Sequence, residues 1–305
     1  MRRIGYAVIV LLAVAPVGAG LLGRAIGPGL LHPMRLNPDR SRQTGEMLAR
    51  TGASKEDFTV RASDGILLRG WRVRSPQSNG DWVVLFHGVS DNRTSVLGHA
   101  EMLLRHGYSV VMMDSRAQGE SGGDIATYGW KERYDAVAVT NALIATAHVR
   151  HLHALGVSMG AAIALQSAAV DPQIESVIAE DPFASLREVT YDYAGLHFSP
   201  WLGKTLFRPA TIFAMGEAAK EGRFSLDEVS PEKAVAARPF PVLLICGTRD
   251  HTIPCRHAEQ IYRAASGPKE LWVVDGAQHA SALGHSPAEY EQRVLRFLSE
   301  TTGRH

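Results

Sequence analysis

The 305-residue sequence has few cysteines and almost no excess of charge of either sign, and both shortages narrow the possible functions. Its 32 basic and 31 acidic side chains give a formal net charge of +1, so no nucleic-acid partner is indicated. The two cysteines, Cys246 and Cys255, are too few for a disulfide framework. We expect Cys246 in the core and Cys255 as a buried loop thiol. A bridge between them stays open, because both flank the same loop.

The sequence also lacks the short motifs that bind metals and nucleotides. It contains no HExxH, no CxxC and no glycine-rich phosphate loop, so we expect no cofactor and no metal. Internal repeats and low-complexity tracts are missing as well. With 45% hydrophobic residues, a chain of this length can bury one large core.

The N-terminal segment differs in composition from everything that follows it. Two arginines precede residues 4–22, a run of 19 residues without charge, which at helical rise covers about 28 Å, close to one bilayer core. Leading arginines favour a cytoplasmic start. We therefore expect a membrane anchor over residues 1–22 and the rest of the chain on the extracytoplasmic side. The small residues Val17-Gly18-Ala19 leave open a cleaved signal peptide and a secreted or periplasmic protein.

The rest of the chain divides into a polar tether over residues 23–55 and one domain over residues 56–305. Predicted strands and helices alternate in this domain, which favours an α/β fold with a mostly parallel sheet of about eight strands and helices on both faces. The first two strands form a hairpin signal around Asp64-Gly65. Strands are expected at 58–61, 66–73, 82–86, 109–113, 153–156, 176–179, 241–246 and 270–274, and helices at 95–106, 131–147, 160–169, 256–265 and 287–299.

Residues 187–239 interrupt the alternation of strands and helices. Fifty residues are too many for a simple connection and predict a substructure of their own. The segment is rich in aromatic and aliphatic side chains, among them Tyr193, Phe198, Trp201 and Phe213. We expect most of them to pack the segment onto the sheet and a few to line an apolar substrate pocket.

The pattern Gly156-Val157-Ser158-Met159-Gly160 lies between a predicted buried strand and a helix rich in alanine. A serine on such a sharp turn exposes its hydroxyl to a substrate carbonyl, and the flanking glycines avoid clashes with the neighbouring strand and helix. A serine hydroxyl needs a base, and the base needs an orienting acid. Candidates for both follow later in the chain, the acid Asp250 first and the base His279 after it. Each comes just after a predicted strand, where functional loops are common.

These motifs together resemble the α/β-hydrolase-fold serine hydrolases. The chain is most similar to the bacterial branch with membrane-anchored esterase-like and serine aminopeptidase-like domains. The resemblance covers roughly residues 56–305 and implies this fold, with residues 187–239 as a helical cap. The blocks that carry it are residues 85–89, 114–121, 156–160, 181–185, 247–254 and 276–279.

The resemblance implies a Ser158-His279-Asp250 triad and an oxyanion hole formed by the backbone N–H groups of Val89 and Met159. Some hydrolases of this fold place the acid after the sixth strand, where this chain has Asp181, but the loop that holds Asp250 matches the family more closely. His251 and His285 are weaker rivals for the base.

Two further features of the sequence bear on the site. His87 is expected to support the oxyanion loop without transferring protons. One departure from the pattern is Ala117-Gln118, where relatives often have Gly-His, which makes transfer of substrate details unsafe.

The function expected from this site is hydrolysis of a carboxylic ester or thioester through an acyl-enzyme, as in a carboxylesterase or lipase. The substrate would be a small-molecule or lipid-like acyl compound. A serine aminopeptidase-like activity is the alternative, with Glu180, Asp181 or Glu188 holding a substrate ammonium. A third hypothesis, a binding module without catalysis, would be indicated by loss of a triad member, and all three are present.

Overall fold

A computed structural model of the chain describes residues 23–24, 27, 29–38, 42–196 and 200–303. The predicted anchor over residues 1–22 lies outside this range. Among the helices within the range, none combines the length and the apolar character that a membrane crossing requires.

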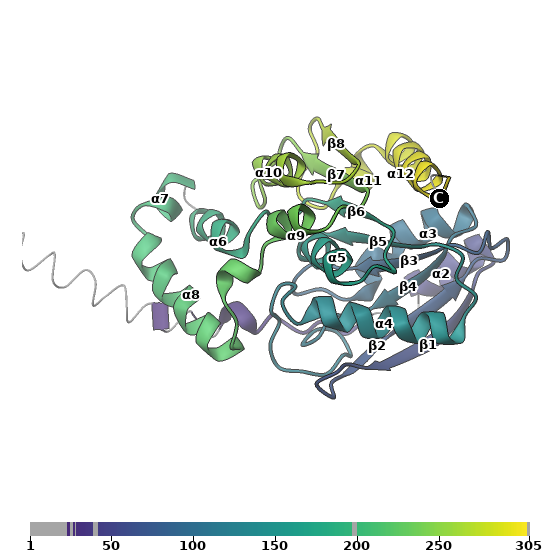
Figure 1. Cartoon of the computed structure of the whole chain (residues 1–305), viewed down its shortest axis with the longest axis horizontal. Coiled ribbons are helices and arrows are strands. Elements are labelled where there is room, and N and C mark those ends of the chain that lie inside the picture. Colours follow the sequence, from purple (N-terminus) through teal and green to yellow (C-terminus); the bar gives the residue numbers. More distant parts are fainter. Residues whose placement is uncertain (1–22, 25–26, 28, 39–41, 197–199, 304–305) are drawn as a thin grey trace, which may run out of the picture.

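The centre of the molecule is one eight-stranded sheet, as the alternation of elements predicted (Figure 1). The strand order is β1-β2-β4-β3-β5-β6-β7-β8; β2 runs antiparallel to both β1 and β4, and all other neighbours are parallel. The predicted α/β-hydrolase fold is therefore confirmed. The strands are β1 (Ser54–Arg61), β2 (Leu67–Arg74), β3 (Trp82–Phe86), β4 (Ser109–Met113), β5 (Leu152–Val157), β6 (Ser176–Glu180), β7 (Val242–Gly247) and β8 (Lys269–Val274).

Helices cover both faces of the sheet, and this explains why its central strands are apolar without alternation. In β3, for example, Val83 and Leu85 face one layer and Trp82 and Val84 the other, and all four are buried. One layer contains α2 (Arg42–Thr51), α3 (Leu97–Arg105), α11 (Ala282–His285) and α12 (Pro287–Thr302), with the short 3-10 helix η1 (Arg93–Val96) before α3. The other contains α4 (Glu132–Thr146), α5 (Met159–Val170) and α10 (Arg256–Ala264).

The segment expected to form a helical cap lies between β6 and β7 and is helical (Figure 1). A separate apolar cluster holds it onto the domain, where Phe183, Leu186 and Val189 pack with Met215 and Phe224. Its elements are α6 (Leu186–Gly195), α7 (Pro200–Lys204), α8 (Arg208–Gly222), η2 (Leu226–Glu228) and α9 (Pro231–Ala237).

Residues 29–36 and α2 correct the expectation of a polar tether over residues 23–55. Leu31 is only 1% exposed and belongs to the apolar cluster of the cap. Met47 of α2 is equally buried and packs with α3 against the sheet. Leu31 follows the apolar N-terminal run and Met47 lies among polar residues, so neither stood out as a core residue in the sequence. Described parts of this region are thus integral to the domain.

The sheet topology fixes where a site can form. Strand β3 lies between β4 and β5. After β3 the chain forms β4 on one side of it and then crosses over to form β5 on the other side. In parallel sheets such a reversal opens a crevice at the carboxyl ends of the strands, where ligands bind. The loop after β3 and the turn after β5 meet at this point, and they carry Val89 and Ser158.

Candidate active site

Ser158 occupies the sharp turn between β5 and α5. Its φ of 58° and ψ of −120° are a strained combination that few L-residues adopt, of the kind found at functional sites. The flanking glycines permit the turn because a Cβ at Gly156 would lie 2.2 Å from the carbonyl oxygen of Gly160. A Cβ at Gly160 would lie 2.2 Å from the carbonyl oxygen of Phe86. Backbone crowding therefore accounts for both glycines of the motif.

The loops after β7 and β8 bring Asp250 and His279 to this serine. The Ser158 hydroxyl lies 2.9 Å from Nε2 of His279, and Nδ1 of His279 lies 2.7 Å from Oδ2 of Asp250. The other carboxylate oxygen of Asp250 accepts hydrogen bonds from the backbone N–H groups of Thr252 and Ile253, at 2.8 and 2.9 Å. These bonds fix the carboxylate, so that one oxygen faces the histidine. The arrangement can pass a proton from Ser158 to His279 while Asp250 holds the ring.

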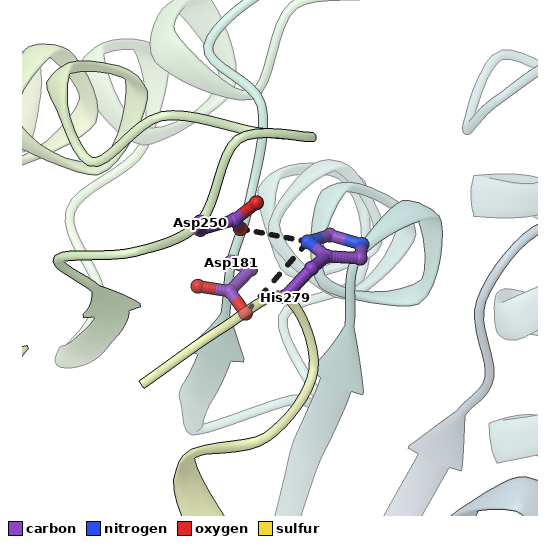
Figure 2. A group of neighbouring side chains, drawn as sticks. All are labelled: Asp181, Asp250 and His279. Atoms are coloured by element: carbon purple, nitrogen blue, oxygen red, sulfur yellow. Dashed lines mark hydrogen bonds and ion pairs between the residues drawn. The ribbon is translucent and has the colours of Figure 1, made fainter. Parts of the chain in front are cut away.

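Asp181, the rival acid, lies beside the same histidine (Figure 2). Its Oδ2 is 3.8 Å from Nδ1 of His279, about 1 Å farther than that of Asp250. Both of its oxygens accept backbone N–H bonds, from Gly247 at 3.2 Å and from Ala280 at 2.7 Å. Asp181 thus ties together the loops that carry Asp250 and His279. Asp181, Asp250 and His279 each offer an atom that could ligate a metal ion, and these atoms lie within 4.8 Å of one another. The two ring nitrogens of His279, however, already face Asp250 and Ser158, as a proton relay requires.

The pKa values of Asp181 and His279 are both raised by their surroundings. Burial, together with the charges of Asp250 and Glu180, raises the pKa of Asp181 to about 8, so this carboxyl is protonated at neutral pH. Burial by itself lowers the pKa of His279, but the hydrogen bond to Asp250 and the surrounding carboxylates outweigh it and raise the pKa above 6.5.

The backbone N–H groups of Val89 and Met159 are available beside Ser158. Met159 is the first residue of α5, where a helix has no internal acceptor for its N–H. Within the described part of the chain, neither N–H has an acceptor. Both residues line the cavity into which Ser158 opens. This position suits them to bind a developing negative charge on oxygen.

His87 supports the loop that carries Val89. It is fully buried, and its Nε2 accepts a hydrogen bond of 2.9 Å from the backbone N–H of Ser115. The other ring nitrogen, Nδ1, must then donate to the carbonyl of Gly88, 2.8 Å away. Burial lowers the pKa of His87, in agreement with a neutral ring in this fixed tautomer.

The departure at Ala117-Gln118 lies close to this machinery. Ala117 has a φ of 61°, a conformation that glycine adopts more easily, so the alanine is strained. The buried side chain of Gln118 lies 3.9 Å from the sulfur of Met159, and its carbonyl oxygen accepts a bond from the backbone N–H of Asp91. Gln118 therefore packs beneath the oxyanion loop. The sequence marked this position as unusual but gave no indication of the contact.

The expectation of two thiols is wrong, and the bridge that the sequence left open is present. Cys246 near the end of β7 and Cys255 just before α10 form a disulfide with an S–S distance of 2.06 Å. The bridge closes the loop that contains Asp250. Their shared flanking position was the signal for the pair, although no sequence pattern required it.

The two rival histidines do not reach Ser158. Nε2 of His285 lies 3.0 Å from the carbonyl of Asp275, and the side chain of His251 is exposed. Glu180, which the sequence analysis considered only as a partner for a substrate ammonium, belongs instead to a buried network behind His279. Glu180 is fully buried and accepts hydrogen bonds from His99, Tyr290 and the backbone N–H of Ala282. Burial opposes ionisation of Glu180, but these bonds outweigh it and lower its pKa.

Two cavities meet at Ser158. The first, of about 410 Å³, is lined by Ser158, Val89, Met159 and apolar side chains of the cap, together with residues 29–34 of the N-terminal segment. The second, of about 320 Å³, is lined by the serine, Val89, His279 and polar residues that include Asp91, Ser95 and His99. Met159 lines only the first cavity and His279 only the second.

The chain belongs to the alpha/beta hydrolase family, whose model matches residues 83–293. It is 28% identical to an uncharacterized protein of Bacillus subtilis, YqkD, over 80% of this chain and 79% of that one. An uncharacterized protein of Mycobacterium tuberculosis is 29% identical over 80% and 79% of the two chains. Among solved structures, the Pyrococcus furiosus esterase Pf2001 is similar, with a TM-score of 0.72, 24% identity and coverage of 88% of this chain and 97% of that one. The last likeness shows the shared fold.

Proposed function

We propose that this hydrolase is a serine esterase that cleaves a carboxylic ester or thioester through an acyl-enzyme. The observation that carries the proposal is the aligned relay from Ser158 through His279 to Asp250, at a strained turn beside two unoccupied N–H donors. Ser158 attacks the acyl carbon and gives its proton to His279, and Asp250 stabilises the imidazolium. The N–H groups of Val89 and Met159 bind the oxyanion; such a donor contributes about 10²–10³ in rate.

The two cavities indicate which half of an ester lies where. His279 must protonate the departing oxygen, so the leaving group faces the second cavity, which His279 lines. The acyl chain then occupies the larger, mainly apolar cavity beyond Met159. An apolar acyl group beside a more polar alcohol or thiol fits this division, and the similarity to an esterase in fold is compatible with it.

The aminopeptidase alternative has weaker support, because its substrate would carry an ammonium group on the acyl side. Among the described residues that line that cavity, none is acidic. Of the carboxylates considered for this role, Glu180 and Asp181 are buried in hydrogen-bond networks, and Glu188 lines a different cavity. Hydrolysis of esters is therefore the better proposal.

The test is a fluorophosphonate probe combined with a substrate panel. The probe should label Ser158, and Ser158→Ala should lower p-nitrophenyl ester turnover by about 10⁶ with a nearly unchanged melting temperature. Ser167→Ala is the matched control, because Ser167 is a buried serine on the same helix outside the cavities, and it should keep both labelling and turnover. Labelling elsewhere, or faster cleavage of aminoacyl-anilides than of esters, would contradict the proposal.

We further propose that residues 1–22 anchor the enzyme with its catalytic domain outside the cytoplasm. The support is the uncharged run after two arginines and the Cys246–Cys255 disulfide, since disulfides persist in oxidising compartments. The full-length protein should stay with membranes through salt and carbonate washes, because apolar burial is not screened by ions. Release by salt alone would exclude an anchor, and a mature N-terminus at Gly20 would show cleavage.

A further inference from the structure

The N-terminal segment forms one wall of the cavity beside Ser158. Residues 29–34 line this cavity together with Phe183 and the cap residue Met215, although the sequence analysis assigned the segment no role in the site. Leu31 is 1% exposed, whereas Met34 is 66% exposed. The segment therefore contributes one deep and one shallow apolar side chain to the same cavity.

Hydrogen bonds hold this wall at both of its ends. The backbone N–H of Ala126 donates to the carbonyl of Leu31 at 2.8 Å, and the Tyr128 hydroxyl donates to the carbonyl of Leu30 at 2.6 Å. The backbone N–H of Met34 donates to the hydroxyl of Ser90, the residue after Val89, at 3.1 Å. These contacts tie the segment to the loop before α4 and to the loop that carries Val89, while Leu31 packs in the apolar cluster of the cap.

Arg35 fastens the segment immediately beyond the cavity. Its guanidinium donates to three backbone carbonyls of a single loop, those of Gly119, Ser121 and Gly123. The planar, always charged guanidinium is suited to hold several acceptors at once, which a flexible lysine ammonium does less well. The same loop carries Gln118, which touches Met159, so the segment and the oxyanion loop share one support.

We propose that residues 30–35 are the element that sets acyl-chain length, and that the enzyme prefers medium-chain acyl esters. This inference rests on the proposed esterase function. At about 30 Å³ for each water-sized group, a cavity of 410 Å³ has room for about 14 such groups, so a chain of roughly ten carbons fits inside it. Leu31 limits the depth of the cavity, and Met34 covers the chain nearer its mouth. Residues far from the triad in sequence therefore select the substrate.

The experiment measures kcat/KM of the full-length protein for p-nitrophenyl acetate, butyrate, octanoate, dodecanoate and palmitate. We expect a maximum near octanoate. Leu31→Ala removes three carbons from the wall and should raise the dodecanoate-to-butyrate ratio about tenfold or more. Met34→Ala should lower the octanoate-to-butyrate ratio severalfold, because the chain loses apolar contact. The exposure of Met34 makes its variant independent of any folding defect in Leu31→Ala.

Two matched controls separate a local wall from general loosening. Leu36→Ala changes an exposed leucine of the same segment that does not line the cavity, and Leu143→Ala changes a core leucine on α4. Both should keep the wild-type profile. An unchanged profile in the two test variants, or the same shift in the controls, would overturn the proposal. Absence of ester hydrolysis in the wild type would instead overturn the proposed function.

Discussion

The floor and the roof of the site are built in different ways. The floor consists of the loops after β3, β5, β6, β7 and β8, and its side chains are held by short hydrogen bonds, so that Asp250 and Asp181 are at most 5% exposed. The roof consists of the cap and residues 29–36, where Trp201 and Leu206 are each 68% exposed. The floor has the order that proton transfer needs, while the roof is joined to it mainly by apolar packing. Under the proposed function, chemistry and substrate choice would belong to separate regions.

The bonds that restrain the floor and the roof also differ in kind. The Cys246–Cys255 disulfide restrains the floor loop that holds Asp250, whereas the N-terminal part of the roof is secured without a covalent link, by the hydrogen bonds of Arg35 and Tyr128 and the apolar packing of Leu31. Hydrogen bonds to backbone carbonyls fix where a segment lies without dictating its side chains. The roof can therefore vary in sequence while the floor keeps its geometry.

The largest effect that tests this division is expected for Asp250→Asn. It should lower kcat by about 10⁴, since an asparagine favours the wrong tautomer of His279. If floor and roof are separate, the ranking of acyl chains from acetate to palmitate should stay as in the wild type. Steady-state kinetics across the ester series checks both statements.

Asp181→Asn is the matched control for Asp250→Asn. Asp181 is already protonated at neutral pH, and its φ of 49° suits asparagine. The asparagine NH2 cannot accept, so one of the two backbone bonds from Gly247 and Ala280 is lost, and kcat should fall by less than about tenfold. If the two effects came out reversed, the acid of the relay would be the residue after β6. A changed chain-length ranking in either variant would mean that the floor also selects the substrate.

A smaller effect is expected from pH. His279 must be neutral to accept the serine proton, and its pKa is raised, so kcat/KM should fall by roughly tenfold per pH unit below a midpoint above 6.5. Asp250→Asn removes the carboxylate that offsets the lowering of the His279 pKa by burial, so the midpoint should move to lower pH. Met34→Ala changes the roof and should leave the midpoint in place. Profiles of kcat/KM between pH 5 and 9 test this, and a midpoint that moves in Met34→Ala would count against separate regions.

Much of the floor could be predicted from the sequence because its signals are local. Gly156 and Gly160 are required by backbone crowding around one turn. The buried strand β7 appears as a short apolar run before Asp250, and the partly buried edge strand β8 as a second run before His279. The order of these residues along the chain then follows the order of the strands. The cap was also foreseeable as a helical segment, because fifty residues between two strands need structure of their own.

The remaining parts depend on contacts between residues distant in sequence. Arg35 meets its carbonyls 84 to 88 residues later, and Glu180 meets Ala282 and Tyr290 more than 100 residues away. No local pattern encodes such contacts, since each partner alone is an ordinary polar residue. Leu31, in a segment that looked like a spacer, is the clearest case.

The sequence by itself determined the family fold and the residues that meet at the floor, because strand periodicity and turn geometry are properties of neighbouring residues. Only the tertiary structure decided that Asp250 lies nearer His279 than Asp181 does, that Cys246 and Cys255 are bonded, and that residues 29–34 line the cavity beside Ser158. These outcomes depend on differences of about an ångström between packed loops, and packing is resolved only when the whole chain is folded.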